Sequence, residues 1–191
     1  MANRLSKIVT KTGDSGHTGL GDGSRVLKSS IRIRAIGDLD EFNCFVGALL
    51  LNPISDDLHN VLQEIQHDIF DIGGELCIPG HTLFLTERVE FLEVHIEQIN
   101  SGLPRLQEFI LPVGIKAAVD AHLCRAVVRR AERNVVELAQ TEAVRPEVLK
   151  YLNRLSDYFF VLARMLNQES DSLHAKETLW KHGRIVSPAA R

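Results

Sequence analysis

Apolar residues recur at intervals of three and four along most of this chain, which is the spacing of one face of an α-helix. The pattern occurs in five segments, each bounded by residues that favour helix ends, such as serine or acidic residues before and glycine or proline after. The segments predict helices from Asp38 to Asn52, from the cap Ser55 to Pro79, from Thr86 to residues 100–102, from about Gly114 to Gln140, and from Pro146 to about Asn167.

Short links and the lack of a secure strand pattern predict an all-α fold, an antiparallel five-helix bundle preceded by an N-terminal glycine-rich loop. The 191 residues, 45% of them hydrophobic, suit one domain: a loop segment over 1–34, the bundle over 35–169, and a tail over 170–191. We expect extended chain at 31–36 and an interruption of the second helix at Gly73 and Gly74. Trp180 indicates that part of the tail docks.

The stretch 10–28 offers almost nothing to a hydrophobic core. It holds five glycines, three threonines, two serines and three basic residues. Such a segment can aim backbone N–H groups, hydroxyls and lysine charges at an anion, the chemistry of a phosphate cradle. A flexible terminal linker has a similar composition, and the glycine spacing matches neither the P-loop nor the dinucleotide pattern. From composition alone the two interpretations are equally supported.

Arginines gather on the predicted fourth helix. Arg125, Arg129 and Arg133 recur every four residues, with Arg130 and Glu132 between them. A solvated charged face is the usual explanation. However, four arginines with one carboxylate repel one another unless anions lie nearby, and arginine suits bidentate phosphate contact. The helix therefore raises a second anion-site hypothesis beside the solvated face.

Two features away from these charges could also face a ligand. Asn153 stands beside the apolar seam of the fifth helix, where its amide needs a partner on another helix or on a ligand. Phe109 lies in a rigid loop, 103–114, that contains two prolines and carries apolar groups. Such loops often face a ligand or a partner, although Phe109 could equally cover an end of the bundle.

Overall charge and cysteine usage limit the classes of function. The net charge of −3 gives no reason to expect a nucleic-acid or membrane surface, so any anion site is local. Cys44, Cys77 and Cys124 are far apart among apolar residues, and we expect each to be a buried free thiol. With no apolar leader or span-length run, these features predict an intracellular, cytoplasmic protein.

Other catalytic motifs find little support. Glu64 and His67 have the Glu-x-x-His spacing of di-iron bundles, but that site needs a second such motif and none occurs, so His67 is interpreted as structural. The sequence contains no Gly-x-Ser-x-Gly, no His-Glu-x-x-His and no cysteine–histidine cluster, and hydrolase and zinc chemistry are therefore not indicated.

Several motifs taken together resemble a known family. Thr-Lys-Thr-Gly-Asp-Ser-Gly at 10–16, Arg-Arg-Ala-Glu-Arg at 129–133 and Tyr-Leu-Asn-Arg-Leu-Ser-Asp at 151–157 are similar to the motifs of PduO-type ATP:cob(I)alamin adenosyltransferases. Gly-Asp-Leu-Asp-Glu at 37–41 and Phe-Ile-Leu-Pro at 109–112 match in order and spacing. The resemblance extends from about Lys7 to Leu166. Val113 stands where the family more often has glycine, and the tail from Ser170 has no clear match.

The resemblance implies a homotrimer that holds ATP, with Mg2+ on its phosphates, at each subunit interface. It also implies an Asp40–Arg129 ion pair across that interface, and a loop that becomes ordered when ATP binds. The resemblance makes the N-terminal glycine-rich segment a nucleotide-binding loop, whose implied contacts are Thr10, Lys11, Thr12, Gly13, Thr18, Gly19 and Lys28. The implied contacts from helices four and five are Arg129, Arg130, Glu132, Arg133 and Asn153. The resemblance places these helix residues on the adjacent subunit.

The implied reaction transfers the 5′-deoxyadenosyl group of ATP to the cobalt of cob(I)alamin and releases triphosphate. The charge that builds on the leaving triphosphate would be stabilised by Arg129 and Arg133, and Asp40 would pair with Arg129 across the subunit interface. Phe109 would occupy the lower face of the corrin and displace its axial base. Trp180 is a candidate corrin contact. A reductase or an adenosylcobalamin-dependent enzyme would be the expected protein partner. The alternative is a non-catalytic ATP-binding trimer that acts as a sensor or cofactor chaperone.

Overall fold

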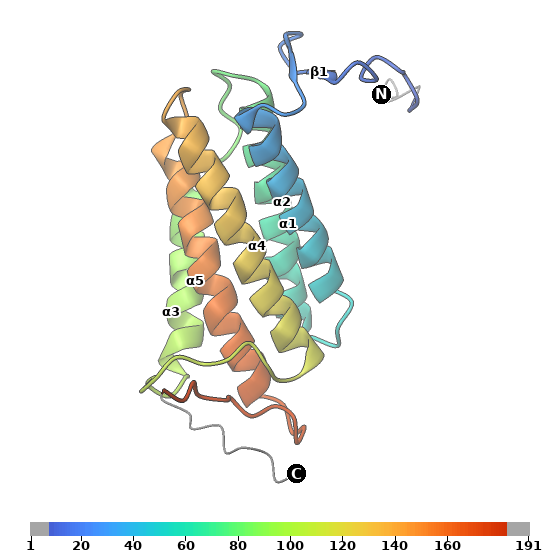
Figure 1. The fold of residues 1–191 in the computed structure, drawn as a ribbon. Coiled ribbons are helices and arrows are strands. Elements are labelled where there is room, and N and C mark those ends of the chain that lie inside the picture. Colours follow the sequence, from blue (N-terminus) through green and yellow to red (C-terminus); the bar gives the residue numbers. More distant parts are fainter. Residues whose placement is uncertain (1–7, 183–191) are drawn as a thin grey trace.

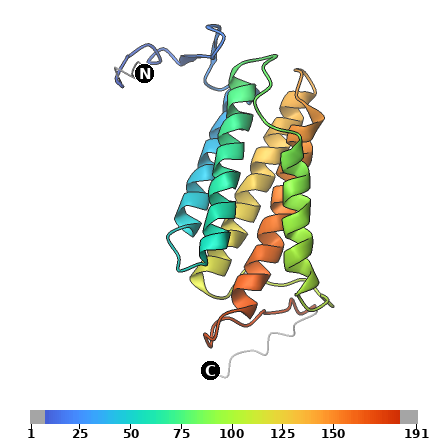
Figure 2. The ribbon, with the colours of Figure 1, turned by 180° about the vertical axis from the view of Figure 1, so that it is seen from behind.

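The computed structural model describes residues 8–182, and it confirms the bundle of five helices (Figure 1). The helices are α1 (Ile31–Leu49), α2 (Asp56–Cys77), α3 (Glu87–Ser101), α4 (Lys116–Ala139) and α5 (Pro146–Gln168). α4 packs against both α1 and α5, while α2 packs on α1 and α3 packs on α5. Figure 2 shows α2 and α3 from the opposite side. Within residues 8–182, no helix is long and apolar enough to cross a membrane.

The first helix begins earlier than the periodicity predicts, so the expectation of extended chain at 31–36 is wrong. Ser30 caps α1 by accepting a hydrogen bond from Ile33 N at 3.5 Å. Arg32 is buried because its guanidinium donates to Glu142, with Nε at 3.0 Å, and to the carbonyl of Leu76. The alternation of isoleucine and arginine is also the pattern of a strand. Here the segment is helical, and the inward-facing Arg32 donates hydrogen bonds to the distant carboxylate of Glu142.

The second helix is not interrupted by its glycines. α2 runs through Gly73 and Gly74 to Cys77, contrary to the sequence expectation. A β-carbon at Gly74 would lie 2.6 Å from Leu83 Cδ1. This glycine therefore allows the link after α2 to pack closely against the helix.

The glycine-rich stretch contains a short hairpin that the sequence pattern does not predict. β1 (His17–Gly19) pairs antiparallel with β2 (Arg25–Leu27), with Thr18 opposite Val26. The turn uses Gly23 at a φ of 86°. Gly21 N donates to the carbonyl of Cys77 at 2.8 Å, which attaches the hairpin to the end of α2.

The core is apolar and continuous through the bundle. Phe42 and Phe159 meet edge to face with ring centroids 5.5 Å apart. The face of α4 that turns inward includes Val128 and Ala131, which are buried, whereas Leu123 and Ala126 are exposed. Packing between two neighbouring helices selects a face that the fourth helix alone does not reveal.

One buried histidine on α4 lacks any polar partner among the described residues. His122 is 5% exposed, and neither of its ring nitrogens has a hydrogen bond. Burial, reinforced by the nearby charge of Arg125 and opposed by that of Glu177, lowers the pKa of His122 to about 4. Because the folded pKa lies below the ordinary value of 6.5, the neutral ring favours folding above that value, and this contribution is lost as the pH falls toward 4.

The substitution His122→Leu should reduce the acid sensitivity of the fold. The depressed pKa makes wild-type stability fall by up to ~3 kcal/mol as the pH drops through this window, since each pKa unit corresponds to about 1.4 kcal/mol. Urea unfolding at neutral pH and at about pH 4.5 measures the difference. The exposed His67→Leu is the matched control. An equal acid-dependent loss in the His122 variant and in wild type would contradict this role.

Candidate nucleotide site

A groove opens between the glycine-rich loop, α1 and α2. Its volume is about 880 Å³, and four predicted site residues line it: Thr18, Gly19, Lys28 and Asp40. It extends from the hairpin along α1 as far as Asn43, a length of about 18 Å at the helical rise. Apolar side chains supply most of the remaining wall, namely Leu20, Ile33, Ile36, Leu39, Ile69, Phe70 and Leu83. A largely apolar groove with a few polar groups, among them Thr18 and Lys28 at the loop, suits an elongated ligand that carries an anionic group.

The glycine-rich loop carries hydroxyls and lysines, and its Thr18 and Lys28 line the groove. Lys28 lies against Gly13, where a β-carbon would be 3.0 Å from Nζ. The hydroxyls of Thr10 and Thr12 are 3.0 Å apart. Lys11 has a φ of 58°, a left-handed conformation that is uncommon for a residue other than glycine. The arrangement concentrates donors in the way that the sequence predicts for a phosphate cradle.

The arginines of α4 form a second group, on the side that faces α5. Arg129 donates from Nη1 to Ser156 Oγ over a long 3.4 Å, and Arg133 donates to the carbonyl of Arg129 at 3.0 Å. Asn153 Nδ2 donates to Glu132 Oε1 at 3.2 Å, so this amide bonds a neighbouring helix. Neither Arg129 nor Arg133 forms an ion pair with a carboxylate among the described residues. Their charge remains available to an anion.

Arg125 strengthens the positive field at this face. Its Nε is buried without a hydrogen-bond partner among the described residues. Burial, with repulsion from Arg129, lowers the pKa of Arg125. A guanidinium destabilised in this way gains from any negative group that approaches.

Arg130 differs from its neighbours because α1 already neutralises it. Its Nε lies 3.1 Å from Asp38 Oδ1, and its Nη2 pairs with Glu41. Asn134 also donates to Asp38. Sequence reasoning counted one carboxylate against four arginines and missed these two, because they come from a helix far along the chain. The part of the cluster that is open to a ligand consists of Arg129 and Arg133.

The groove and the arginine face do not meet within one chain. Asp40 lines the groove between α1 and α2, whereas Arg129 faces α5, and no ion pair joins them among the described residues. α4 lies between α1 and α5 (Figure 1). The predicted nucleotide residues therefore fall into two groups on different sides of the bundle.

The loop 103–114, which carries Phe109, lies at the other end of the bundle from the glycine-rich loop (Figure 1). The side chain of Phe109 is 78% exposed, so it does not cover the end of the bundle. Trp180, 40% exposed, donates its backbone N–H to the carbonyl of Phe109 at 2.7 Å, which confirms that the tail docks. An exposed phenylalanine on a loop held by the tail suits contact with a flat apolar ligand.

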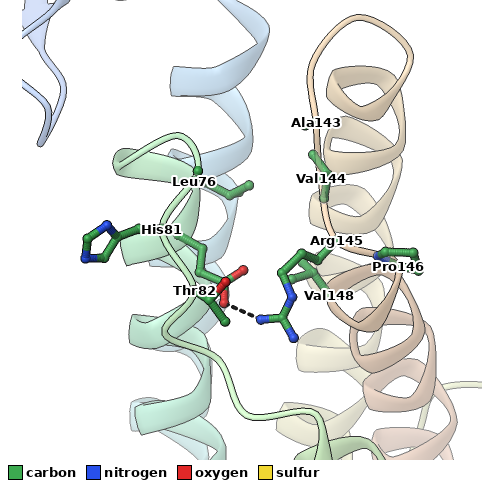
Figure 3. A pocket seen from close by; sticks show the side chains of 10 residues that line it. Leu76, His81, Thr82, Ala143, Val144, Arg145, Pro146 and Val148 are labelled. Atoms are coloured by element: carbon green, nitrogen blue, oxygen red, sulfur yellow. Dashed lines mark hydrogen bonds and ion pairs between the residues drawn. The ribbon is translucent and has the colours of Figure 1, made fainter.

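A smaller cavity, of about 310 Å³, lies between the link after α2 and the link before α5 (Figure 3). Arg145 reaches across it to Glu75, whose carboxylate also accepts from Leu83 N at 2.8 Å and Phe84 N at 2.7 Å. The ring of His81 points away from Arg145 in Figure 3. Glu75 and Arg145 at the centre of this cavity both have hydrogen-bond partners within the chain. We therefore interpret their ion pair as a structural contact between the two links and not as a ligand site.

The cysteines agree only in part with the predicted burial. Cys124 is buried and its thiol pKa is raised by burial, as expected of an unreactive thiol. Cys77 is half-buried, and Cys44 is exposed, which contradicts the expectation for that residue. Cys44 occupies a surface position of α1, although the apolar residues next to it in the sequence suggest burial.

Comparison with known proteins identifies a family for this chain. A sequence model of the cobalamin adenosyltransferase family matches residues 8–166. A cobalamin adenosyltransferase of Cupriavidus metallidurans is 54% identical over 96% of this chain and 99% of its own. The corrinoid adenosyltransferase of Bacillus subtilis is 45% identical over 86% of this chain and 88% of its own.

Solved structures give the same result. A phenylalanine-to-alanine variant of the PduO-type ATP:corrinoid adenosyltransferase from Lactobacillus reuteri, complexed with cobalamin and ATP, has a TM-score of 0.84 and 34% identity over 92% of this chain and 99% of its own. An arginine-to-lysine variant complexed with ATP has a TM-score of 0.82 and 36% identity over 91% and 100%. The fold is thus the PduO-type helical bundle. The chain belongs to the cobalamin adenosyltransferase family.

The two kinds of arginine on α4 should separate in stability measurements. Arg130→Gln removes both ion pairs to α1 and should lower the free energy of unfolding by about 1 kcal/mol, more at low salt. The matched Arg133→Gln removes only a bond to a backbone carbonyl and should leave stability nearly unchanged. Urea unfolding at two salt concentrations measures both. Equal losses would show that α1 does not hold Arg130.

Proposed function

We propose that this protein transfers the 5′-deoxyadenosyl group of ATP to the cobalt of cob(I)alamin and releases triphosphate. The observation that carries the proposal is a donor-rich loop beside an elongated groove, together with two arginines on another side of the bundle that pair with no carboxylate among the described residues, in a chain that also exposes Phe109 on a fixed loop. Relatives that share most of their length with this chain are named corrinoid adenosyltransferases.

ATP would be bound between two copies of the chain. The triphosphate would be held by the loop, through Thr10, Lys11, Thr12, Gly13, Thr18, Gly19 and Lys28, and by Arg129, Glu132, Arg133 and Asn153 of another copy. A site shared in this way accounts for two donor groups that do not meet within one chain. A closed ring of three copies would give each copy one complete site. Asp40 would pair with Arg129 across the contact.

Arg130 has the weakest claim among the proposed nucleotide contacts. The resemblance includes it, but its guanidinium is engaged by Asp38 and Glu41. In our proposal its contribution is to hold α4 against α1, which keeps Arg129 and Arg133 in place.

The metal in this proposal arrives with the substrate. No group of three histidine, cysteine, aspartate or glutamate side chains within residues 8–182 could hold a metal ion. Mg2+ commonly binds substrate phosphates and keeps several waters, so MgATP is the expected substrate. The protein would then need only to bind the oxygens that the metal leaves free.

The reaction needs alignment more than acid–base catalysis. The electron pair of cobalt(I) attacks C5′ of ATP, a cobalt–carbon bond forms, and the C5′–oxygen bond breaks with its electron pair leaving on the triphosphate. The cobalt becomes formally cobalt(III). Arg129, Arg133 and Lys28 would stabilise the charge that builds on the leaving group, and the two sides of the groove would set the line of attack.

Phe109 would control the lower axial position of the corrin. An aromatic ring placed beneath the cobalt leaves no room for the axial base. Loss of that ligand makes reduction to cobalt(I) easier, since axial ligation sets the potential of such a metal. The 78% exposure of Phe109 leaves its ring free for this contact.

The decisive experiment mixes the protein with MgATP and chemically reduced cobalamin under anaerobic conditions. Adenosylcobalamin should appear by its absorbance, with one triphosphate for each product formed. Binding of ATP without any product would support the non-catalytic trimer and overturn the enzyme proposal.

Arg129→Ala should weaken ATP binding by about 10- to 100-fold, the effect of losing charged hydrogen bonds to phosphate. Stability should change little, because among the described residues the Arg129 side chain forms only the long hydrogen bond to Ser156. Calorimetric titration with MgATP measures the affinity, and sedimentation tests whether assembly also weakens. Arg34→Ala, which removes an exposed arginine paired with Glu137, is the control. Unchanged affinity and unchanged assembly in the Arg129 variant would exclude it from the site.

Phe109→Ala should leave ATP affinity unchanged and slow adenosylation, because the axial base is no longer displaced. The rate with cob(II)alamin and a reductant tests this directly, and a smaller effect is expected when cob(I)alamin is prepared in advance. Leu173→Ala, which truncates another exposed apolar side chain, is the matched control. A normal rate with cob(II)alamin would disprove the role of Phe109.

A further inference from the structure

The loop that carries Phe109 is fastened to α5 at both ends. Near its start, Arg164 Nη2 donates to the carbonyl of Pro104 at 2.7 Å. Near its end, Asn167 Nδ2 donates to the carbonyl of Val113 at 3.0 Å, and Asn167 Oδ1 accepts from Ile115 N at 3.0 Å. Two side chains three residues apart on one helix thus set the span of the loop.

The C-terminal tail fixes the middle of the same loop. Trp180 N donates to the carbonyl of Phe109 at 2.7 Å, and Leu111 N donates to the carbonyl of Thr178 at 2.8 Å. These bonds pair the tail with the loop as a short antiparallel bridge. In Figure 1 the tail runs beside the loop beneath the ends of the helices. The backbone on both sides of the Phe109 side chain is therefore held.

One buried side chain connects the loop, the tail and α5. Arg164 is 3% exposed, and besides its bond to Pro104 its Nε donates to Glu177 Oε1 at 2.7 Å. Glu177 directly precedes the segment that pairs with the loop. A charged hydrogen bond that is shielded from water is stronger than one at the surface, so this ion pair can hold the tail in register.

We propose that the Arg164–Glu177 ion pair and the tail segment Thr178 to Trp180 position Phe109 beneath the corrin. The inference rests on the proposed function and assigns the tail a part in it. Phe109 is 78% exposed, so packing of its own ring does not determine where the ring points. Its direction depends on the backbone, and the tail supplies the bonds that fix that backbone. Glu177 and Arg164 are positioning residues, since neither needs to touch the corrin.

This arrangement gives the tail a mechanical role. A ring that displaces an axial base must stay in place against the tendency of the base to return. If the loop were released on the tail side, Phe109 would sample several directions, and the base would occupy the cobalt for part of the time. ATP binding would be unaffected, because among the described residues Arg164, Glu177 and the tail segment form no hydrogen bond with the residues proposed to hold ATP.

The test compares Glu177→Gln with Asp171→Asn, which removes the same charge from an exposed position in the tail. Trp180 is the only tryptophan of the chain, so its fluorescence reports on tail docking. We expect Glu177→Gln to shift this emission to longer wavelength and to lower kcat with cob(II)alamin about tenfold, at an unchanged KM for ATP. The absorbance of bound cob(II)alamin should show a larger fraction with the axial base attached. Glu177→Asp should restore part of the rate, and Asp171→Asn should match wild type.

The outcomes separate this inference from the proposed function. If wild type forms no adenosylcobalamin, the proposed function fails, and with it the role assigned to the tail. If wild type is active and Glu177→Gln releases the tail but retains the wild-type rate and base-free corrinoid, only the positioning role is overturned. A fall in ATP affinity together with a lowered unfolding temperature would also overturn it, because the ion pair would then be a general structural contact.

Discussion

The packing of α4 between α1 and α5 determines where every charge of the candidate site lies. On the side of α4 toward α1, Asp38 and Glu41 form ion pairs with Arg130 and neutralise its charge. The side toward α5 meets only a hydroxyl and an amide, and it keeps Arg129 and Arg133 without a carboxylate. In the proposed site, one helix thus serves both as a structural element and as an anion-binding surface, and the division follows from which neighbour each arginine faces.

The sequence predicts the four later helices well, because each has a long apolar stripe and clear end residues. The sequence prediction is wrong at the start of α1, where isoleucine and arginine alternate as in a strand. Arg32 can be buried in a helix there because its guanidinium donates to Glu142, 110 residues away. The site follows the same rule. Local motifs single out Lys28, Arg129 and Phe109 as candidate site residues, but the groove wall formed by Ile33 and Phe70 depends on the packing of α1 against α2, which no local pattern records.

The two loops at the ends of the bundle are stabilised by different means. The glycine-rich loop depends on backbone bonds within its hairpin and on one bond to Cys77. The Phe109 loop depends on buried polar side chains of α5, namely Arg164 and Asn167. Composition marks the first loop by its glycines and threonines, although it does not predict the hairpin. The second kind remains hidden until α5, the loop and the tail are brought together.

In the proposed site, the attachment of the hairpin to α2 reduces the length of chain that becomes ordered when ATP binds. From Gly21 to Lys28 the chain is already fixed by the bond to Cys77 and by Lys28 N donating to Gly16 O at 2.9 Å. Conformational entropy is therefore lost mainly by the residues before Gly16, at about 1–2 kcal/mol for each backbone unit that becomes fixed. A pre-folded hairpin lowers the entropic cost of closing the cradle and leaves more of the interaction free energy to appear as affinity.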